Sequence, residues 1–218
     1  MSAPLPIKLY MHSGAVGGPN PYKVLIVLHH LDIPFTKVAT DDSKAEWYVK
    51  DINPNGRIPA IEDPNTGLTL WESGAIIEYL VDEYDKGGKI SVKNGKGAWE
   101  AKQYLHFQMS GQGPYFGQAV WFYRFGDNMP DGKKRYLEQV ERVMMVLNNI
   151  LEGKEYLVDD RLTYADLAFV PWNMVVQKWP LLSDPLWKPY QIEEKYPNFV
   201  KWQNKLCALD AVKRSYEP

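Results

Sequence analysis

The stretch "GGPNPYKVLIVLHHL" at residues 17–31 begins with turn-forming residues and continues as an apolar run at helical spacing. Strand-like segments stand on either side of it, "IKLYM" at 7–11 and "FTKVAT" at 35–40. A strand, a helix and a second strand in this order predict a parallel pair of strands joined by a right-handed crossover. The chain therefore opens as a β-α-β unit, with Asn20 where the helix is expected to begin.

Two further strand-like segments follow, "IPAIED" at 58–63 and "LTLWE" at 68–72. The short turn "DPNTG" between them predicts an antiparallel hairpin. Parallel and antiparallel pairs together indicate a small mixed sheet. A helix is expected from Ser73 to about Tyr84, because apolar residues recur there at helical spacing.

The composition is that of an ordinary globular protein, with 45% apolar residues and a net charge of -2. Basic residues are scattered, so we expect no nucleic-acid partner. Apolar runs long enough to span a membrane, about 18 residues, do not occur in the sequence. The single cysteine, Cys207, excludes an internal disulfide and a CxxC redox pair, and it lies far along the chain from the first helix. We expect a cytoplasmic protein without a membrane partner.

Residues 86–97, "KGGKISVKNGKG", combine glycine and lysine with little to bury. We therefore predict an α/β domain at 1–86, a linker at 87–97 and an all-helical domain at 98–218. Helical periodicity in the second domain covers 98–109, 115–125, 132–152, 163–178 and 197–216. Thr163 and Asp166 have the spacing of a capping box at the start of one of these helices.

The Asn20-Pro21 pair is a helix-start signal, because asparagine caps exposed N–H groups and proline at the first helical position loses no hydrogen bond. Two interpretations stay open. Asn20 is a structural cap, or its amide lies at the positive end of the helix dipole and holds an anion such as a thiolate.

Two other sites likewise allow both a structural and a ligand-binding interpretation. The Ile58-Pro59 bond enters a strand, and a cis bond there would let the backbone of Ile58 pair with a peptide-like ligand; the alternative is an ordinary tight turn. Ser73 is expected to be the N-cap of the next helix. With Glu72 beside it, the pair would also suit an α-amino acid end group, Ser73 for the carboxylate and Glu72 for the ammonium.

No metal site is expected, since the four histidines do not converge: His12 and His106 are isolated and two others are adjacent on one helix. Tyr10 and Ser13, at the end of the first strand, are interpreted as packing or turn-capping hydroxyl donors. The aromatic stretch "GPYFGQAVWFYRF" at 113–125 either packs in a core or walls a binding pocket for an apolar substrate. The pocket candidates in it are Tyr115, Phe116, Phe122, Tyr123 and Arg124.

Taken together, the motifs resemble cytosolic glutathione transferases, over nearly the whole chain. The segments "GPNPYKV", "NPNGRIPAIED", "WESGAIIEYL", "FQMSGQGPYFGQA" and "DLAFVPWN" resemble the fungal branch related to the yeast nitrogen-catabolite-repression regulator. This resemblance implies a thioredoxin-like N-terminal domain that binds glutathione as co-substrate, and an all-helical domain that supplies most of the pocket for a small-molecule electrophile. It also implies a homodimer.

The resemblance further implies roles for single residues. Asn20 would lie near the glutathione sulfur, Ile58 would pair through its backbone before a cis Pro59, and Glu72 with Ser73 would bind the γ-glutamyl end. Basic candidates for the glycine carboxylate are Lys44 and, more weakly, Arg57. The sequence departs from the pattern at Pro21, where relatives carry glycine. The expected function is glutathione transfer, and the alternatives are a non-catalytic glutathione-binding regulator or thiol chemistry at Cys207.

Overall fold

The computed structural model describes residues 4–13 and 18–217. The chain divides into two compact units, Met1–Ser91 with Leu209–Pro218, and Val92–Ala208. The first unit has a sheet of four strands in the order β2-β1-β3-β4: β1 (Ile7–Met11), β2 (Phe35–Ala39), β3 (Ala60–Asp63) and β4 (Leu68–Trp71).

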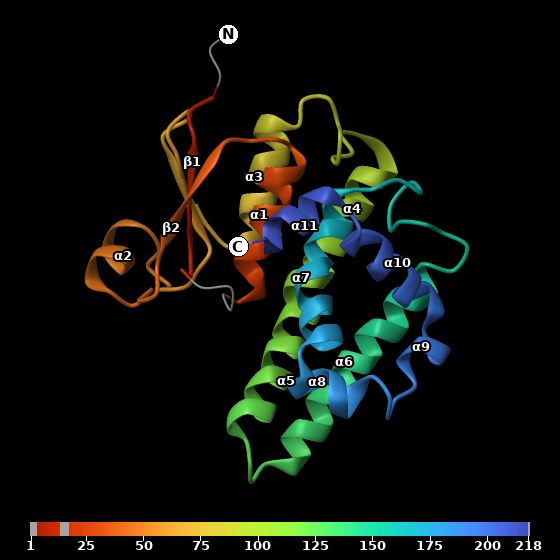
Figure 1. Ribbon diagram of the computed structural model, residues 1–218. Helices are drawn as coiled ribbons and strands as arrows, with labels where there is room; N and C mark the ends of the chain where they lie inside the picture. The colour runs from red at the N-terminus through yellow and green to blue at the C-terminus, as the bar shows by residue number, and fades with distance from the viewer. Residues whose placement is uncertain (1–3, 14–17, 218) are drawn as a thin grey trace. The chain divides into compact units, whose positions relative to one another are not determined.

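The sheet is mixed, as the sequence predicts. β1 pairs in parallel with β2 and antiparallel with β3, and β3 forms an antiparallel hairpin with β4. Alternate residues of β1 and β3 point to one face, where Ile7, Leu9 and Ile61 are fully buried. The helices α1 (Pro19–His30) and α3 (Ser73–Tyr84) cover this face, and the short helix α2 (Glu46–Asp51) lies on the other (Figure 1).

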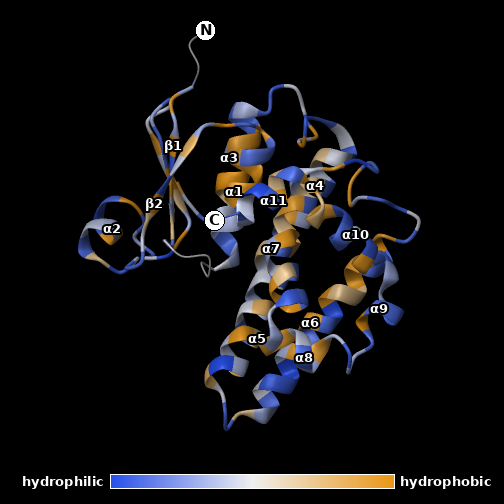
Figure 2. Ribbon diagram, viewed as in Figure 1, coloured by the Kyte–Doolittle hydropathy of each residue, from blue (hydrophilic) through white to orange (hydrophobic). Residues whose placement is uncertain are grey.

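Helix α1 is buried almost all round. The expected stripe of Val24, Leu25, Val27 and Leu28 is fully buried, whereas Leu31 follows the helix and is half-buried. Helix α11 (Asp210–Tyr216) packs against α1 on the side away from the sheet (Figure 1). In Figure 2 the middle of α1 is orange, the colour of hydrophobic residues, whereas α11 is largely polar. A helix enclosed in this way is a rigid support for whatever its first turn presents.

The last ten residues thus group with the first unit, although the sequence predicts one continuous helix over 197–216 within the second. That helix is interrupted at Ala208 and Leu209. The rings of Tyr22 and Tyr216 stack with centroids 4.4 Å apart, and Arg214 donates to the carbonyl of His29 at 2.8 Å. These contacts tie the C-terminal helix to α1.

One side chain, that of Asp85, fixes the backbone of the glycine- and lysine-rich segment after α3. The carboxylate of Asp85 accepts hydrogen bonds from the backbone N–H groups of Lys89, Ile90 and Ser91, at 2.6 to 2.9 Å. Ile90 is fully buried. Composition predicts an exposed linker here, but a single capped turn and one apolar anchor hold its first half against the first unit.

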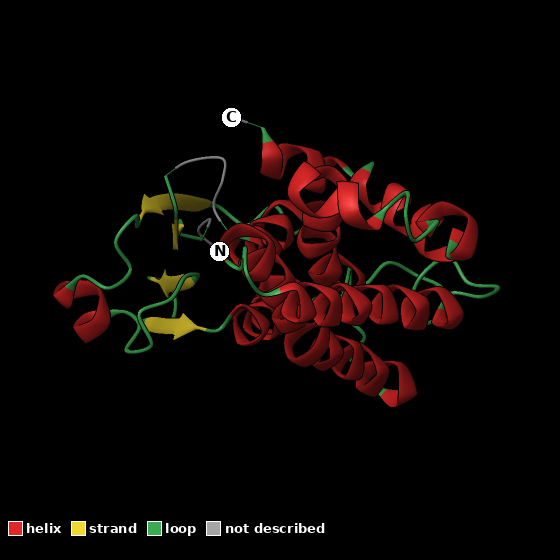
Figure 3. Ribbon diagram, turned by 90° about the horizontal axis from the view of Figure 1, so that it is seen from below, coloured by secondary structure: helices red, strands yellow, loops and turns green. Residues whose placement is uncertain are grey.

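The second unit is helical over the residues described, apart from one isolated bridge between Val158 and Arg161 (Figure 3). Its elements are α4 (Gly95–Phe107), the π-helical turn η1 (Gln108–Gln112), α5 (Gly113–Phe125), α6 (Pro130–Ile150), α7 (Tyr164–Lys178), α8 (Pro180–Leu186), α9 (Ile192–Lys195) and α10 (Pro197–Cys207). None of the helices in the described ranges is both long and apolar enough to cross a membrane.

The predicted capping box at Thr163 and Asp166 is present at the start of α7. Asp166 is buried and also accepts hydrogen bonds from the backbone N–H of Leu157 and the indole N–H of Trp202, both at 3.0 Å. Burial raises the pKa of Asp166, and these donors oppose that rise. One carboxylate therefore joins the helix start, the preceding loop and α10.

We expect Thr163→Ala to lower the free energy of unfolding by about 1–2 kcal/mol, because it removes the cap hydroxyl from a buried helix start. Urea denaturation followed by tryptophan fluorescence measures the change. Thr163→Ser keeps the hydroxyl and is the matched control. Equal losses in the two variants would show that the hydroxyl does not stabilise this helix.

Candidate functional site

The sheet topology brings four segments to one edge. β1 and β2 are parallel and β3 runs against both, so the carboxyl ends of β1, β2 and β4 lie beside the amino end of β3. The first turns of α1 and α3 begin at this edge, because each helix follows a strand that ends there. Asn20, Pro59, Glu72 and Ser73 are thereby placed along the same edge of the first unit.

Asn20 lies inside α1 rather than before it, which corrects the predicted cap. The helix begins at Pro19 with Gly18 as N-cap, so Pro19 and not Pro21 takes the first helical position. Both prolines are tolerated because the N–H groups of a first turn have no partner within the helix. Asn20 is the second helical residue and half-buried. Its amide remains within the turn where the helix dipole is most positive.

The loop before β3 is a turn built by asparagine side chains. Asn53 accepts the backbone N–H of Asn55 at 2.9 Å, and its own carbonyl accepts the N–H of Gly56 at 2.8 Å. Gly56 has φ of +60°, which a residue without Cβ adopts at no steric cost. The carbonyl of Arg57 accepts the Tyr48 hydroxyl at 2.8 Å and the amide of Asn53 at 2.7 Å.

The Ile58-Pro59 bond that follows this turn is cis, as the resemblance implies. Ile58 is half-buried and packs against a cluster of Tyr10, Tyr48 and Ala60. Since Ala60 begins β3 and pairs with both Tyr10 and Trp71, the backbone just before it lies between the ends of β1 and β4.

The two basic candidates lie on the same turn. The ammonium of Lys44 donates to the carbonyl of Asn55 at 3.1 Å, and its side chain covers Gly56, where an added Cβ would come within 2.9 Å of Nζ. Arg57 is exposed. Lys44 therefore contacts the turn that leads to Ile58, and Arg57 directly precedes Ile58 in the chain.

Glu72 adopts a backbone conformation that L-residues rarely occupy, with φ of +70° and ψ of 113°. It is exposed and is the N-cap residue of α3, whereas the sequence predicts Ser73 in that position. Ser73 is the first helical residue and only 3% exposed. Backbone strain of this kind is held in place only where the surrounding structure demands it, and it gathers at functional sites.

Lys23 is a residue of this edge that sequence patterns did not reveal. Lys23 is on α1 and only 1% exposed. The helical spacing of the sequence predicts it on the solvent-facing, polar side of the helix. Burial lowers the pKa of Lys23 to about 7, and the negative charge of Glu72 opposes that fall. The one hint in the sequence is that Lys23 stands directly between Tyr22 and Val24, two residues expected to be buried.

The five pocket candidates of the second unit lie on α5. Phe116 is fully buried, which favours the core interpretation for that ring. The others contact α6 or their own helix: Phe122 stacks on Tyr136 at 5.2 Å, Arg142 lies over Tyr115, Lys133 lies over Tyr123, and Arg124 lies over Phe125.

Groups of three or more His, Cys, Asp or Glu arranged for a metal are absent from the part of the chain that the structure describes. Cys207 ends α10, and burial raises the pKa of its thiol, while Gln203 donates a hydrogen bond to the sulfur. A thiol with a raised pKa is a poor nucleophile at neutral pH. This argues against thiol chemistry at Cys207 as the function of the protein.

Comparison with known proteins gives matches in both units. Residues 17–83 match the model for the glutathione S-transferase N-terminal domain, and residues 115–210 match the model for the C-terminal domain of the same enzymes. The chain belongs to the glutathione S-transferase family. The predicted thioredoxin-like domain followed by a helical domain is confirmed, as is the transferase class.

Relatives cover nearly the whole of this glutathione S-transferase. The glutathione S-transferase-like protein gedE of Aspergillus terreus is 40% identical, over 98% of this chain and 96% of its own. The glutathione transferase URE2P6 of Phanerochaete chrysosporium, crystallised with oxidized glutathione, is 42% identical with a TM-score of 0.86, over 96% of this chain and 94% of that chain. The expected fungal branch is thus confirmed.

A third relative was crystallised with a glutathione conjugate. Ure2p5 of Phanerochaete chrysosporium, cocrystallized with 1-(S-glutathionyl)-2,4-dinitrobenzene, is 35% identical with a TM-score of 0.85, over 99% of this chain and 94% of that chain. Its ligand is an aryl group joined to the sulfur of glutathione.

Replacing Glu72 tests the backbone strain directly. We expect Glu72→Gly to exceed Glu72→Ala in free energy of unfolding by about 1 kcal/mol, because both variants lose the carboxylate but only glycine accepts a positive φ without a Cβ clash. Chemical denaturation measures both. An alanine variant as stable as the glycine variant would contradict the strain argument.

Proposed function

We propose that this protein transfers glutathione to a small apolar or aromatic electrophile, and that the side-chain amide of Asn20 stabilises the glutathione thiolate. The observation that supports the proposal is the meeting of the first turn of α1, the cis Pro59 and the strained Glu72 at one edge of the sheet. Each offers what one part of an extended tripeptide needs: an anion site, a pairing backbone and a group for an ammonium.

The tripeptide would lie along this edge. The backbone of Ile58 pairs with its central residue, as an added strand would. Ser73 and the first N–H groups of α3 face its α-carboxylate, and Glu72 faces its ammonium. Lys44 and Arg57, beside the same turn, supply positive charge for the carboxylate at the other end.

The amide and the helix start both favour the ionised form of the thiol. A free thiol has a pKa of about 8.5, and only the thiolate is strongly nucleophilic. Lowering that pKa by two units requires about 2.7 kcal/mol. A hydrogen bond to a charged group contributes about 1.5–3 kcal/mol, and the helix N-terminus adds about 0.3–1 kcal/mol. The sum, about 1.8–4 kcal/mol, brackets the requirement. At its lower end the bound thiol is still mostly protonated below pH 7, so a base beside the sulfur would add to turnover.

The electrophile is assigned to the helical unit. Tyr115, Phe122 and Tyr123 are half-buried rings on α5 with exposed atoms, and Arg124 is exposed beside them. Such side chains suit an aromatic substrate with a polar group. Phe116, which is fully buried, would support these rings from the core rather than touch the substrate. The proposal also includes a cytoplasmic location and a homodimer. Sedimentation velocity tests the homodimer.

The test uses 1-chloro-2,4-dinitrobenzene, whose conjugate is the ligand of the relative Ure2p5. The thiolate forms the carbon–sulfur bond and chloride leaves with the bonding electrons. We expect Asn20→Ala to lower kcat/KM with this probe by at least about tenfold, since a charged hydrogen bond of about 1.5–3 kcal/mol is lost, while glutathione binding changes little.

Difference absorption of the bound thiolate completes the test. In Asn20→Ala the thiol of bound glutathione should ionise at higher pH than in the wild type. Asn149→Ala, at an amide on α6 in the second unit, is the matched control and should behave as wild type. Full activity in Asn20→Ala would remove that residue from the mechanism. Tight glutathione binding without turnover of a broad electrophile panel would favour a regulator that binds glutathione.

A further inference from the structure

A histidine and an aspartate meet at the edge that carries Asn20. His12 directly follows β1, and Asp41 lies two residues after β2, its parallel neighbour. The pairing continues past the strand ends, because the N–H of Thr40 donates to the carbonyl of Met11 at 2.8 Å. Two segments that are 29 positions apart in the chain are therefore held side by side by the sheet itself.

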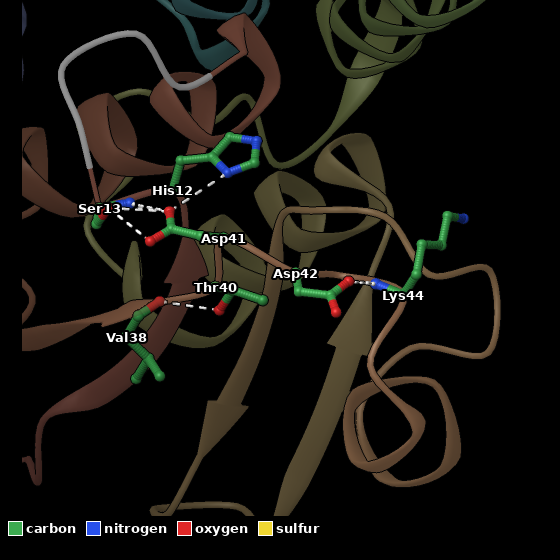
Figure 4. Close-up of polar contacts among 7 residues, drawn as sticks. All are labelled: His12, Ser13, Val38, Thr40, Asp41, Asp42 and Lys44. Carbon is green, nitrogen blue, oxygen red and sulfur yellow. Dashed lines mark hydrogen bonds and ion pairs between the residues drawn. The ribbon is translucent and has the colours of Figure 1, made fainter.

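The carboxylate of Asp41 is fixed by Ser13. The backbone N–H of Ser13 donates to Oδ1 at 2.9 Å, and its hydroxyl reaches Oδ1 at 2.9 Å and Oδ2 at 2.7 Å (Figure 4). These bonds lower the pKa of Asp41, the backbone N–H contributing most, with His12 as a smaller cause. The group is thus a charged carboxylate of fixed orientation at neutral pH.

This carboxylate faces one nitrogen of the imidazole. Nδ1 of His12 is 3.7 Å from Oδ1 of Asp41, and the other ring nitrogen lies on the far side of the ring (Figure 4). A fixed negative charge next to Nδ1 favours the tautomer with its proton there, which leaves Nε2 as a hydrogen-bond acceptor. The same division of roles occurs wherever an aspartate orients a histidine base.

We propose that His12, oriented by Asp41, accepts the proton that the thiol of glutathione loses when it binds. This inference rests on the proposed function, since it deepens the same site. The S–H bond breaks, its electron pair stays on sulfur as the thiolate beside Asn20, and the proton moves to Nε2. The resulting imidazolium is stabilised by Asp41 and passes the proton to water when the conjugate leaves.

The other charged groups near this edge have hydrogen-bond or charge partners of their own. Asp42 accepts the backbone N–H of Lys44 at 2.9 Å (Figure 4). The ammonium of Lys44 donates to the carbonyl of Asn55 at 3.1 Å. On α1, Lys23 is buried and its charged neighbour is Glu72. Of the carboxylates drawn in Figure 4, Asp41 is the one within ion-pair distance of the imidazole.

The position of His12 separates it from the other histidines. His29 and His30 are at the opposite end of α1, where that helix stops, and His106 is exposed on α4 of the second unit. The sequence shows four scattered histidines and no cluster. Only the parallel register of β1 and β2 reveals that the segments that follow these two strands lie side by side.

The test compares His12→Gln, Asp41→Asn and the control His106→Gln, in pH profiles of kcat/KM with 1-chloro-2,4-dinitrobenzene. We expect His12→Gln to lower kcat/KM by about two- to sixfold at pH 6.5, where part of the bound thiol is still protonated, and to leave it nearly unchanged at pH 9, where solvent ionises the thiol. Asp41→Asn should give a smaller loss with the same pH dependence. His106→Gln should match wild type at both values.

A second measurement uses the wild-type protein alone. In ¹⁵N-histidine spectra recorded at one fixed pH, the fraction of His12 that is protonated at Nε2 should rise when glutathione is bound. A pH-independent loss in His12→Gln, an unchanged profile, or an imidazole that does not gain a proton on binding would each overturn the role of His12 alone. A wild type that neither binds nor turns over glutathione would overturn the proposed function, and this inference with it.

Discussion

The position of β1 between a parallel and an antiparallel neighbour is the constraint on which the rest of this unit depends. Because the β1–β3 pair is antiparallel, the loop that enters β3 meets the loops that leave β1 and β2. The hairpin then returns β4 to the same edge, so that Glu72 follows Trp71 directly into α3. An all-parallel arrangement of the same strands would place the Ile58-Pro59 bond at the opposite edge.

Packing around this edge carries two local costs. Glu72 holds a positive φ, and Lys23 is buried in a helix that is otherwise enclosed by apolar side chains. Neither choice improves the core, since a glycine and a leucine would suit the two environments better. Their occurrence within one layer of the unit, at the start of α3 and in the second turn of α1, indicates that this layer is arranged for a ligand.

The sequence predicted the elements better than their ends. The strand-like segments, the DPNTG turn and the capping box at Thr163 are local signals, and each was confirmed. The start of α1 was misplaced because GPNP offers two prolines that both fit a first turn, and only packing selects Pro19. The contact of His12 with Asp41 and the return of α11 to α1 depend on pairing between distant segments, which one sequence does not display. The substrate rings stay predictions, because a pocket for an electrophile would be formed by tertiary packing, which one sequence does not display.

The proposed division of labour between Asn20 and His12 follows from charge. An amide at a helix start stabilises a thiolate but removes no proton, so ionisation by the amide alone requires the proton to leave the site for solvent. A nearby imidazole keeps that proton at the same edge. The step then creates a thiolate and an imidazolium together, without changing the net charge near the dipole of α1. Asp41 is required in this scheme because the positive end of that dipole disfavours an imidazolium that has no carboxylate beside it. Without Asp41, the same helix terminus that attracts the thiolate would repel the imidazolium of His12.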